Sequence, residues 1–425
     1  MTFRIRRISG TAVCVQTVWV GPVGATHVET FATLPTDDPK FNKKEKPLNK
    51  GKHIASITFL AVAAAFAGSA NASVARVATG GTNGLSRTAT SQIVGFNSTA
   101  TAVAGGDPRY TAPMPQYSGV VGLLMDYGAG GQFVCSGSLM ADRRSILTAA
   151  HCVSDGTPDR PLSTTVFFYD GANPDTYVYN SPPGVQTRQV TNYVVHSEYT
   201  GEVIDQNDVA VLWMDTAAPA SMTSYGLFTN SNLEGSDFNV AGYGARSTVG
   251  GNLGNNAGTG RLRQGDNRID FRLGDDDFAD FFVDPIDWWG PAAEYSYLYD
   301  FDNGRAANDT SCMIAGAFGL GGDKYCNTGL GQDEVKSAGG DSGGPGFIDG
   351  KVATITSYGL TFGAGWGDLD NSLNNTFGEF GGVVPVWLHD GFIRESMVPE
   401  PGSLALLGMG LAGLFGARRR KVSKA

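Results

Sequence analysis

Positive charge is scarce in the body of this 425-residue chain. Residues 73–397 contain 17 Lys or Arg against 36 Asp or Glu, a net charge of −19. Because phosphate backbones are bound by basic surfaces, this balance argues against nucleic acid as a partner. It is typical of a soluble protein outside the cytoplasm; an acidic surface that only confers solubility is the alternative interpretation.

Cysteine is scarce too, with five in the chain, and no CxxC pair or Cys/His spacing predicts a zinc site. One cysteine, Cys14, lies near the start. The other four form an even set, as expected in an oxidising compartment, and allow three pairings. We favour the local pairs Cys135–Cys152 and Cys312–Cys326, because they close the shortest loops. No cofactor is expected.

Two Asp-containing stretches look like insertions, residues 274–309 and 360–380. Aspartates in loops can bind calcium, but neither stretch has the full D-x-D-x-D-G register of a calcium loop. We therefore expect solvated loops rather than a metal site.

Long apolar runs are absent, and the first short run, residues 54–66, lies behind the basic segment KKEKPLNKGK. Ala70-Asn71-Ala72 follows it and fits the A-x-A cleavage pattern, which predicts a signal peptide ending at Ala72. The run is too short for a membrane span, and a buried core helix is the alternative. Since about 42 residues precede the basic segment, residues 1–72 also hold an upstream extension. Either the assigned start lies too far upstream or the signal is unusually long.

The second apolar run, residues 402–416, follows Pro399-Glu400-Pro401 and precedes Arg418-Arg419-Arg420. It is marginal as a transmembrane segment, although basic side chains at its end can snorkel. The three parts in this order, over residues 398–421, resemble the PEP-CTERM sorting signal of Gram-negative bacteria. The resemblance implies passage through the export machinery, transient anchoring in the inner membrane and removal of the tail by an exosortase. The mature protein would then lie in the cell envelope, at the cell surface or outside. A plain tail anchor or a hydrophobic terminal helix is the alternative.

Long amphipathic helical patterns are also absent, apart from a short one at residues 386–396. Short runs rich in β-branched and aromatic residues recur between turn clusters, a pattern that predicts an all-β sandwich or barrel. Seven runs are clear: 164–170, 176–180, 189–196, 208–214, 237–244, 267–273 and 351–359. Residues 73–102, rich in Ser, Thr, Ala and Gly, are interpreted as a pro-segment or flexible leader.

The stretch GGDSGGP, residues 339–345, surrounds one hydroxyl with glycines. A serine such as Ser342 is a poor nucleophile unless a base removes its proton. LTAAHC supplies His151 as that base, and Asp208, at the head of an apolar strand, can orient the imidazole. Because Gly340 has no side chain, the N–H groups of Gly340 and Ser342 can point at one spot and hold an oxyanion.

LTAAHC, HSEYTGEVIDQNDVAVL and GGDSGGP, in this order, resemble the trypsin/chymotrypsin family of serine peptidases. CSGSLM, AGYGARS, SYGL and GGVVPVWLHDGFI resemble further family segments, so the peptidase domain is predicted to span residues 103–397. The resemblance implies two packed antiparallel β-barrels, a short C-terminal helix and a triad of His151, Asp208 and Ser342 in the cleft. It also implies that the strand containing Ser357 pairs with the substrate backbone.

In this family a freed N-terminus folds inward and pairs with the aspartate before the serine, here Asp341. Two new termini fit the pattern, Val103 and Ile93, and we favour Val103. Neither follows Lys or Arg, so activation by a trypsin-like cut is not indicated.

The position that sets cleavage preference in the family is Lys336 here, with Asp333 and Glu334 close by. Gly359 and Gly382 are expected to keep the pocket open. If Lys336 lines the pocket, an acidic side chain is preferred before the cleaved bond; the alternative is that Lys336 points to solvent. No cleavage preference follows from the sequence.

The sequence thus predicts an exported serine endopeptidase that acts on polypeptides through an acyl-enzyme. An esterase or amidase using the same site, and a non-catalytic surface or matrix-binding protein on the same fold, remain as alternatives. The other body histidines, His196 and His389, are interpreted as structural or surface residues.

Overall fold

The computed structural model describes residues 2–8, 11–17, 78–82, 85–90, 93–95, 97, 99–100, 106–285 and 288–397. The chain forms two compact units, Met1–Phe66 and Ala67–Ala425. In the first unit, β1 (Thr2–Ile8) and β2 (Thr11–Thr17) pair as an antiparallel hairpin. The expected signal-peptide run, Val103 and the C-terminal sorting signal lie outside the described residues. Within the described parts of the chain, no helix is both long and apolar enough to cross a membrane.

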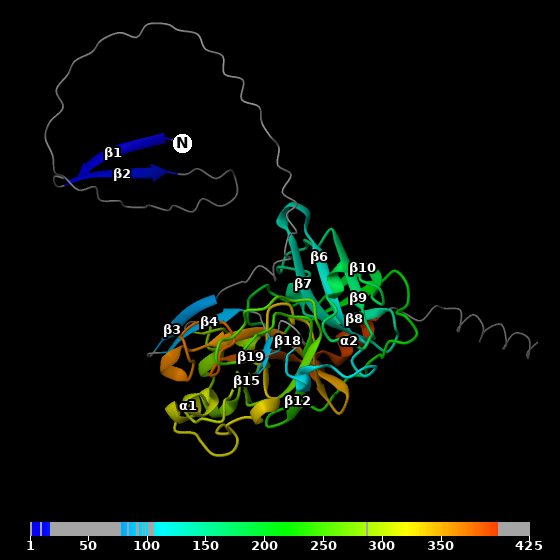
Figure 1. Ribbon diagram of the computed structural model, residues 1–425. Coiled ribbons are helices and arrows are strands. Elements are labelled where there is room, and N and C mark those ends of the chain that lie inside the picture. Colours follow the sequence, from blue (N-terminus) through cyan, green and yellow to red (C-terminus); the bar gives the residue numbers. More distant parts are fainter. Residues whose placement is uncertain are drawn as a thin grey trace, which may run out of the picture. The chain divides into compact units, whose positions relative to one another are not determined.

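Six antiparallel strands of the second unit close into a barrel in the order β10-β11-β8-β7-β6-β9 (Figure 1). They are β6 (Val120–Asp126), β7 (Gln132–Leu139), β8 (Ser145–Thr148), β9 (Ser163–Phe168), β10 (Gln186–Val195) and β11 (Ala210–Met214). Apolar residues such as Leu123, Val166 and Leu212 have no exposed surface and fill the core. Burial of this apolar area is the main force that closes the barrel.

The rest of the unit is built on a curled sheet, in the order β13-β12-β17-β18-β19-β15-β14. Its strands are β12 (Asp237–Gly242), β13 (Arg263–Arg268), β14 (Phe271–Arg272), β15 (Tyr297–Asp300), β17 (Pro345–Ile348), β18 (Lys351–Thr361) and β19 (Phe380–Pro385). A hairpin of β3 (Ala78–Thr82) and β4 (Leu85–Thr90) extends the sheet from β18. The predicted all-β, two-barrel fold is confirmed, with the second barrel present as a curled half-barrel.

Five of the seven predicted strands are present as single strands, and the other two differ. Residues 176–180 form the 3-10 turn η4 (Val178–Asn180) instead of a strand. Residues 267–273 divide into β13 and β14 because the chain turns at Ile269, whose N–H donates to the Ser236 carbonyl oxygen over 3.0 Å.

Helices are few and short in the described residues. The expected C-terminal helix is present as η10 (Val386–His389) and α2 (Asp390–Ser396). Helix α1 (Thr310–Ala317) was not predicted; Asp309 caps it by accepting the Cys312 N–H at 2.8 Å. The remaining 3-10 turns are η1 (Pro108–Tyr110), η2 (Gly128–Gly130), η3 (Ala150–Cys152), η5 (Asp276–Phe278), η6 (Phe281–Val283), η7 (Pro291–Ala293), η8 (Gly331–Asp333) and η9 (Ala364–Trp366).

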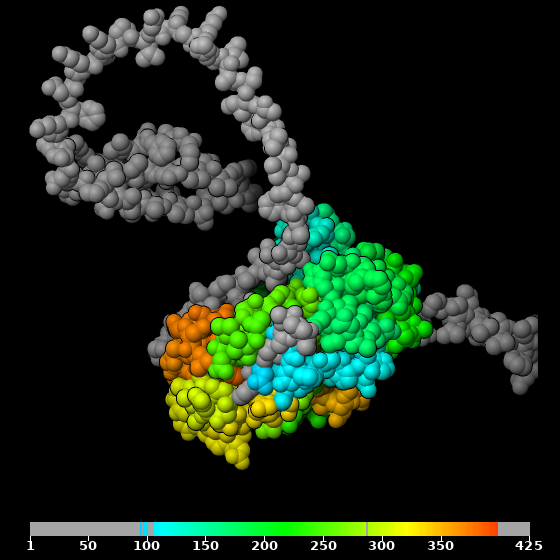
Figure 2. Space-filling view, viewed as in Figure 1, coloured from blue at the N-terminus to red at the C-terminus, as the bar shows by residue number. Residues whose placement is uncertain are grey.

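The expected solvated loops at residues 274–309 and 360–380 are only partly solvated, because exposed runs such as 304–307 and 369–372 alternate with buried residues. The first contains β15 and the fully buried Phe278 and Phe282. The two stretches meet where Asn308 Nδ2 donates to the Gly367 carbonyl oxygen at 2.5 Å. Beside this bond, Thr310 Oγ1 donates to the carbonyl oxygen of Trp366 (2.8 Å) or of Gly378 (2.7 Å). In Figure 2 the yellow segment around α1 lies beside the orange segment that includes residues 360–380. The aromatic content of these stretches outweighs their acidity, because burying such rings is strongly favourable.

Part of the expected leader also packs on the body. Strand β5 (Ile93–Gly95) pairs antiparallel with β16 (Val335–Ser337), with Val94 opposite Lys336. Val94 is fully buried. The packed body therefore begins before residue 103, inside the stretch expected to be a leader.

Candidate active site

His151 lies in the turn η3 that follows β8, on the edge of the closed barrel. The predicted disulfide between Cys135 and Cys152 is present and ties this turn to β7. The Sγ of Cys152 lies 3.6 Å from the carbonyl oxygen of Ser342. The disulfide thus packs against the serine loop of the other sheet.

Asp208, just before β11, holds His151 from two sides. The Nδ1 of His151 lies 2.7 Å from Oδ2 of Asp208, and the His151 backbone N–H donates to Oδ1 at 2.8 Å. Ser357 Oγ, on β18, donates to Oδ2 over 2.5 Å. Burial alone would raise the pKa of Asp208, but the charge of His151 and the hydrogen bonds from His151 and Ser357 outweigh it, so the pKa lies below its ordinary value.

The other ring nitrogen of His151, Nε2, has no hydrogen-bond partner among the described residues. With Nδ1 engaged by Asp208, Nε2 is the atom left to take a proton. The Ser342 side chain is fully buried beside this turn. The described residues contain no Ser342–His151 hydrogen bond, and such bonds often tighten only when substrate is bound.

The loop around Ser342 needs its glycines for two physical reasons. Gly340 and Gly343 have φ of 101° and 79°, the left-handed region that side chains disfavour. A Cβ at Gly343 would lie 2.0 Å from Oγ1 of Thr148, on β8. The loop can therefore approach the first barrel only because these positions lack side chains.

Asp341 is fully buried and accepts two backbone N–H groups, from Gly244 at 2.8 Å and from Ala338 at 3.0 Å. No cation pairs with it within the described part of the chain. Burial raises the pKa of Asp341 well above its ordinary value, although the Gly244 amide opposes this. Asp341 is therefore a buried acid without charge compensation, the situation that an incoming ammonium group would relieve.

The structure contradicts one of the two alternatives that the sequence left open for Lys336, a side chain that points to solvent. Its side chain is fully buried rather than pointing to solvent, and Nζ forms an ion pair with Oε2 of Glu379 at 3.0 Å. Glu379 is also fully buried. The charge of Lys336 is thus already neutralised, so an acidic preference would not follow even if Lys336 lined the pocket. No local sequence pattern marks Glu379 as the partner, because the two residues lie 43 positions apart.

Gly382 also has a different role from the one expected. A Cβ there would lie 2.2 Å from the ring of Tyr358, which is buried and hydrogen-bonds through its OH to Ser296 Oγ at 2.6 Å. The space beside Gly382 is therefore filled by this ring rather than kept open. Gly359 lies on β18 opposite Thr90 of β4.

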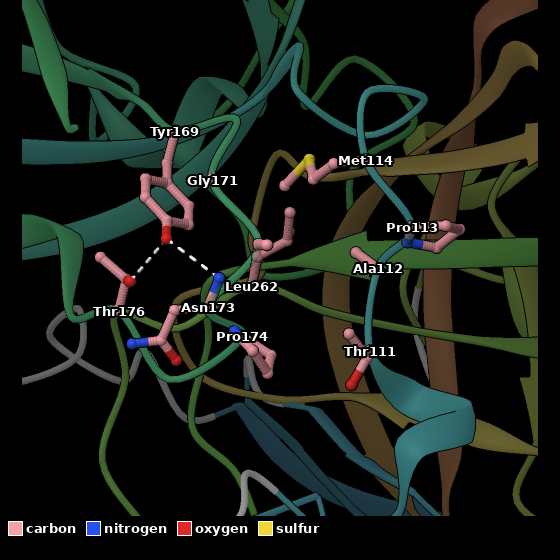
Figure 3. A pocket seen from close by; sticks show the side chains of 11 residues that line it. Thr111, Ala112, Pro113, Met114, Tyr169, Gly171, Asn173, Pro174, Thr176 and Leu262 are labelled. Atoms are coloured by element: carbon pink, nitrogen blue, oxygen red, sulfur yellow. Dashed lines mark hydrogen bonds between the residues drawn. The ribbon is translucent and has the colours of Figure 1, made fainter.

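A separate pocket of about 250 Å³ lies away from these residues (Figure 3). It is formed by residues 111–114 on one side and the loop 169–176 on the other, with Leu262 between them. The Tyr169 hydroxyl accepts hydrogen bonds from the Thr176 Oγ1 at 2.8 Å and from the Asn173 N–H at 3.2 Å. None of the predicted site residues lines this pocket.

The remaining predicted residues are placed as follows. The second predicted disulfide, Cys312–Cys326, is present. His389 is buried, with Nε2 2.7 Å from the Gln206 carbonyl oxygen, and its ring lies 4.9 Å from that of His196. Burial lowers the pKa of His389 to about 4. The rings of His196 and His389 thus pack against each other.

Two segments of the chain are similar to known families. Residues 110–267 match the family model described as Trypsin, and residues 398–421 match the PEP-CTERM protein-sorting motif. The first match contains His151 and Asp208, and Ser342 lies beyond it. No curated protein matches the chain. The sorting motif indicates export and sorting to the envelope of a Gram-negative bacterium, and both disulfides are compatible with that location. The chain therefore carries a domain of the trypsin family of serine peptidases, followed by a PEP-CTERM protein-sorting motif.

Proposed function

We propose that this protein is an exported serine endopeptidase in which Ser342 is the nucleophile, His151 the general base and Asp208 the orienting acid. The observation that carries the proposal is the pair of contacts between His151 and Asp208, which fixes one ring nitrogen and leaves Nε2 without a partner. A buried, ionised aspartate in this position stabilises the imidazolium that forms during the reaction. The additional hydrogen bond from Ser357 supports the ionised form.

The reaction follows from these roles. Ser342 Oγ attacks the carbonyl carbon of the substrate while its proton moves to His151 Nε2. In this proposal the N–H groups of Gly340 and Ser342 hold the oxyanion of the tetrahedral intermediate. His151 then gives the proton to the leaving amine, and water attacks the acyl-enzyme by the same steps in reverse.

We propose further that the leader makes the exported chain a latent precursor. Strand β4 pairs antiparallel with β18, with Thr90 opposite Gly359 and Thr88 opposite Thr361. This is the edge next to Ser357, at which the family resemblance predicts pairing with a substrate backbone. Since one edge accepts one strand, β4 and a substrate compete for it.

The pairing of β5 with β16 favours Ile93 over Val103 as the mature N-terminus. A cut before Val103 would remove β5 and the buried Val94 from the body. It would also remove Thr99 and Ala100, whose N–H groups donate to the Ser247 carbonyl oxygen at 2.9 and 2.8 Å. A cut before Ile93 keeps all of these contacts and separates them from β4.

The sorting motif indicates where the proposed peptidase would act. Exosortase processing of residues 398–421 would release the peptidase domain at the envelope, where its substrates are polypeptides. An esterase or amidase using the same site remains the second candidate; comparing the rates on matched peptide and ester substrates separates the two. A non-catalytic matrix-binding protein is the third.

Active-site labelling with a fluorophosphonate tests the proposal. Forms starting at residues 73, 93 and 103 and ending at 397 are labelled, and mass spectrometry locates the adduct. We expect labelling at Ser342 that Ser342→Ala and His151→Ala abolish, strongest in the form starting at Ile93. Labelling only in the form starting at Val103 would contradict the assignment of the mature terminus. Absence of labelling in every form would contradict the peptidase proposal and favour the matrix-binding protein.

A further inference from the structure

Three aspartates, far from the His151 turn in sequence, gather at the end of β15 and the start of α1. One carboxylate oxygen from each of Asp300, Asp302 and Asp309 lies within 4.8 Å of the other two. All three residues are buried, with exposed fractions of 3%, 0% and 2%. Like charges at such distances repel strongly where water is excluded, so the cluster requires compensation.

Hydrogen bonds compensate only part of this cluster. Asp300 Oδ2 accepts the Ser311 N–H at 2.9 Å, and Asp309 Oδ1 accepts the Cys312 N–H at 2.8 Å. In contrast, no donor group of the described residues reaches either buried carboxylate oxygen of Asp302, whose neighbour here is the Asp300 carboxyl. Buried polar atoms in native proteins are nearly always satisfied, so an unsatisfied carboxylate points to a missing ligand.

Neighbouring groups add negative rather than positive charge. Asp270 Oδ2 accepts the Asp300 N–H at 2.7 Å, and Glu334 Oε1 accepts the Asp302 N–H at 2.5 Å. Within the described residues no Lys or Arg forms an ion pair with these acids; Lys324, for example, pairs with Asp275 at 2.7 Å.

We propose that Asp300, Asp302 and Asp309 bind a calcium ion. Calcium prefers carboxylate and carbonyl oxygens at about 2.3–2.6 Å, so two oxygens on opposite sides of the ion lie up to about 5 Å apart. The observed spacing of up to 4.8 Å fits this requirement without rearrangement. The cluster contains no sulfur or imidazole, which argues against zinc, and magnesium favours shorter bonds and a shell of retained water.

The ion would tie together segments that also support the serine loop. Glu334 directly precedes β16, which leads through Lys336 to Ser342. Asn267 Nδ2, on β13, donates to the carbonyl oxygens of Asp300 at 2.9 Å and of Val335 at 2.8 Å. Calcium binding is therefore expected to stabilise the strand next to the proposed active site. The site itself does not depend on the peptidase chemistry.

Calcium titration of the full-length chain tests this proposal, with Ser342→Ala in every sample to exclude self-cleavage. The protein is treated with a chelator, exchanged into metal-free buffer and titrated by calorimetry, and its thermal unfolding is followed with and without calcium. We expect one calcium ion per chain, a higher melting temperature and weaker binding of magnesium. Because Ser342→Ala is inactive under the proposed mechanism, the result is independent of whether the peptidase proposal holds.

Three variants make the test specific. Asp302→Asn should weaken calcium binding by about tenfold or more, since ligand charge sets affinity in such sites. Asp309→Asn should do the same while keeping the side-chain oxygen that caps α1, and it serves if Asp302→Asn does not fold. Asp277→Asn is the matched control: it lies in the same acidic stretch, but its carboxylate is exposed and paired with Lys324 at 2.9 Å. Lack of calcium binding at millimolar concentration, or unchanged binding in both Asp302→Asn and Asp309→Asn, would overturn the proposal.

Discussion

The buried pair of Lys336 and Glu379 allows a quantitative prediction. Nζ and Oε2 lie 3.0 Å apart, and neither side chain is exposed. Removing one partner of such a pair leaves the other charge buried and costs about 3–5 kcal/mol of unfolding free energy. We therefore expect losses of this size for Lys336→Met and for Glu379→Gln.

The double variant Lys336→Met/Glu379→Gln should lose less than either single variant, because no uncompensated charge remains. A glutamine can keep the acceptor that now receives the Asn374 and Thr376 N–H groups at 2.8 and 3.0 Å. The loss in Lys336→Met should also shrink as the pH falls. Burial raises the pKa of the Glu379 carboxyl, and without the charge of Lys336 to oppose this the carboxyl can take up a proton more readily.

Urea unfolding followed by intrinsic fluorescence, with Ser342→Ala in every sample, measures these losses. Arg394→Met is the control, since Arg394 pairs with Asp390 at 2.8 Å on the surface and its loss should cost at most about 0.5 kcal/mol. A double variant that loses the sum of the two single losses would show that the charges are not coupled. That result would refute the reasoning.

Three further predictions use other parts of the molecule. Because Lys336 is neutralised by Glu379, peptide-library profiling of the active enzyme should show no enrichment of Asp or Glu before the cleaved bond, and enrichment would mean that the pair opens. Burial lowers the pKa of His389 from 6.5 to about 4, so the neutral, buried ring contributes fully to the free energy of unfolding above about pH 6.5, and this contribution is lost as the pH falls towards 4. In urea unfolding, His389→Gln should therefore remove a pH-dependent loss of stability of up to about 3 kcal/mol. An unchanged pH profile of stability in this variant would contradict the prediction. Replacing Cys312 and Cys326 by Ser, which opens a disulfide spanning a separation of 14 residues, should cost about 3 kcal/mol in urea unfolding, and a loss below about 1 kcal/mol would show that the bridge adds little.

Some features of the fold and site could be predicted from the sequence because they depend on local patterns. The strand at residues 208–214 is apolar on nearly every side, and it is present as β11. Gly340, expected to let the backbone turn because it has no side chain, has a φ of 101°. The two disulfides follow from short separations, which make the local pairings the least costly to close.

Other features could not be predicted because they depend on contacts between distant segments. The local charge of the acidic stretch 274–309 predicts a solvated loop. Phe278 and Phe282 of this stretch instead lie in a buried aromatic cluster. Glu379 neutralises Lys336 across 43 positions. The same holds for Asp302 and Glu334, which meet only when β15 and β16 are both in place.

These distant contacts converge on the short segment that leads to Ser342. Three contacts restrain this segment around Lys336. The Lys336 backbone pairs with Val94 of β5, and the Lys336 side chain pairs with Glu379. Two residues earlier, Glu334 accepts the Asp302 N–H. Because the backbone is restrained at each of these points, a change at one of them is transmitted along β16 rather than absorbed locally. Removing β5 by a cut before Val103 and binding calcium at the aspartates should therefore both affect the serine loop through β16. If so, calcium should increase fluorophosphonate labelling of the form starting at Ile93 more than that of the form starting at Val103, which lacks β5.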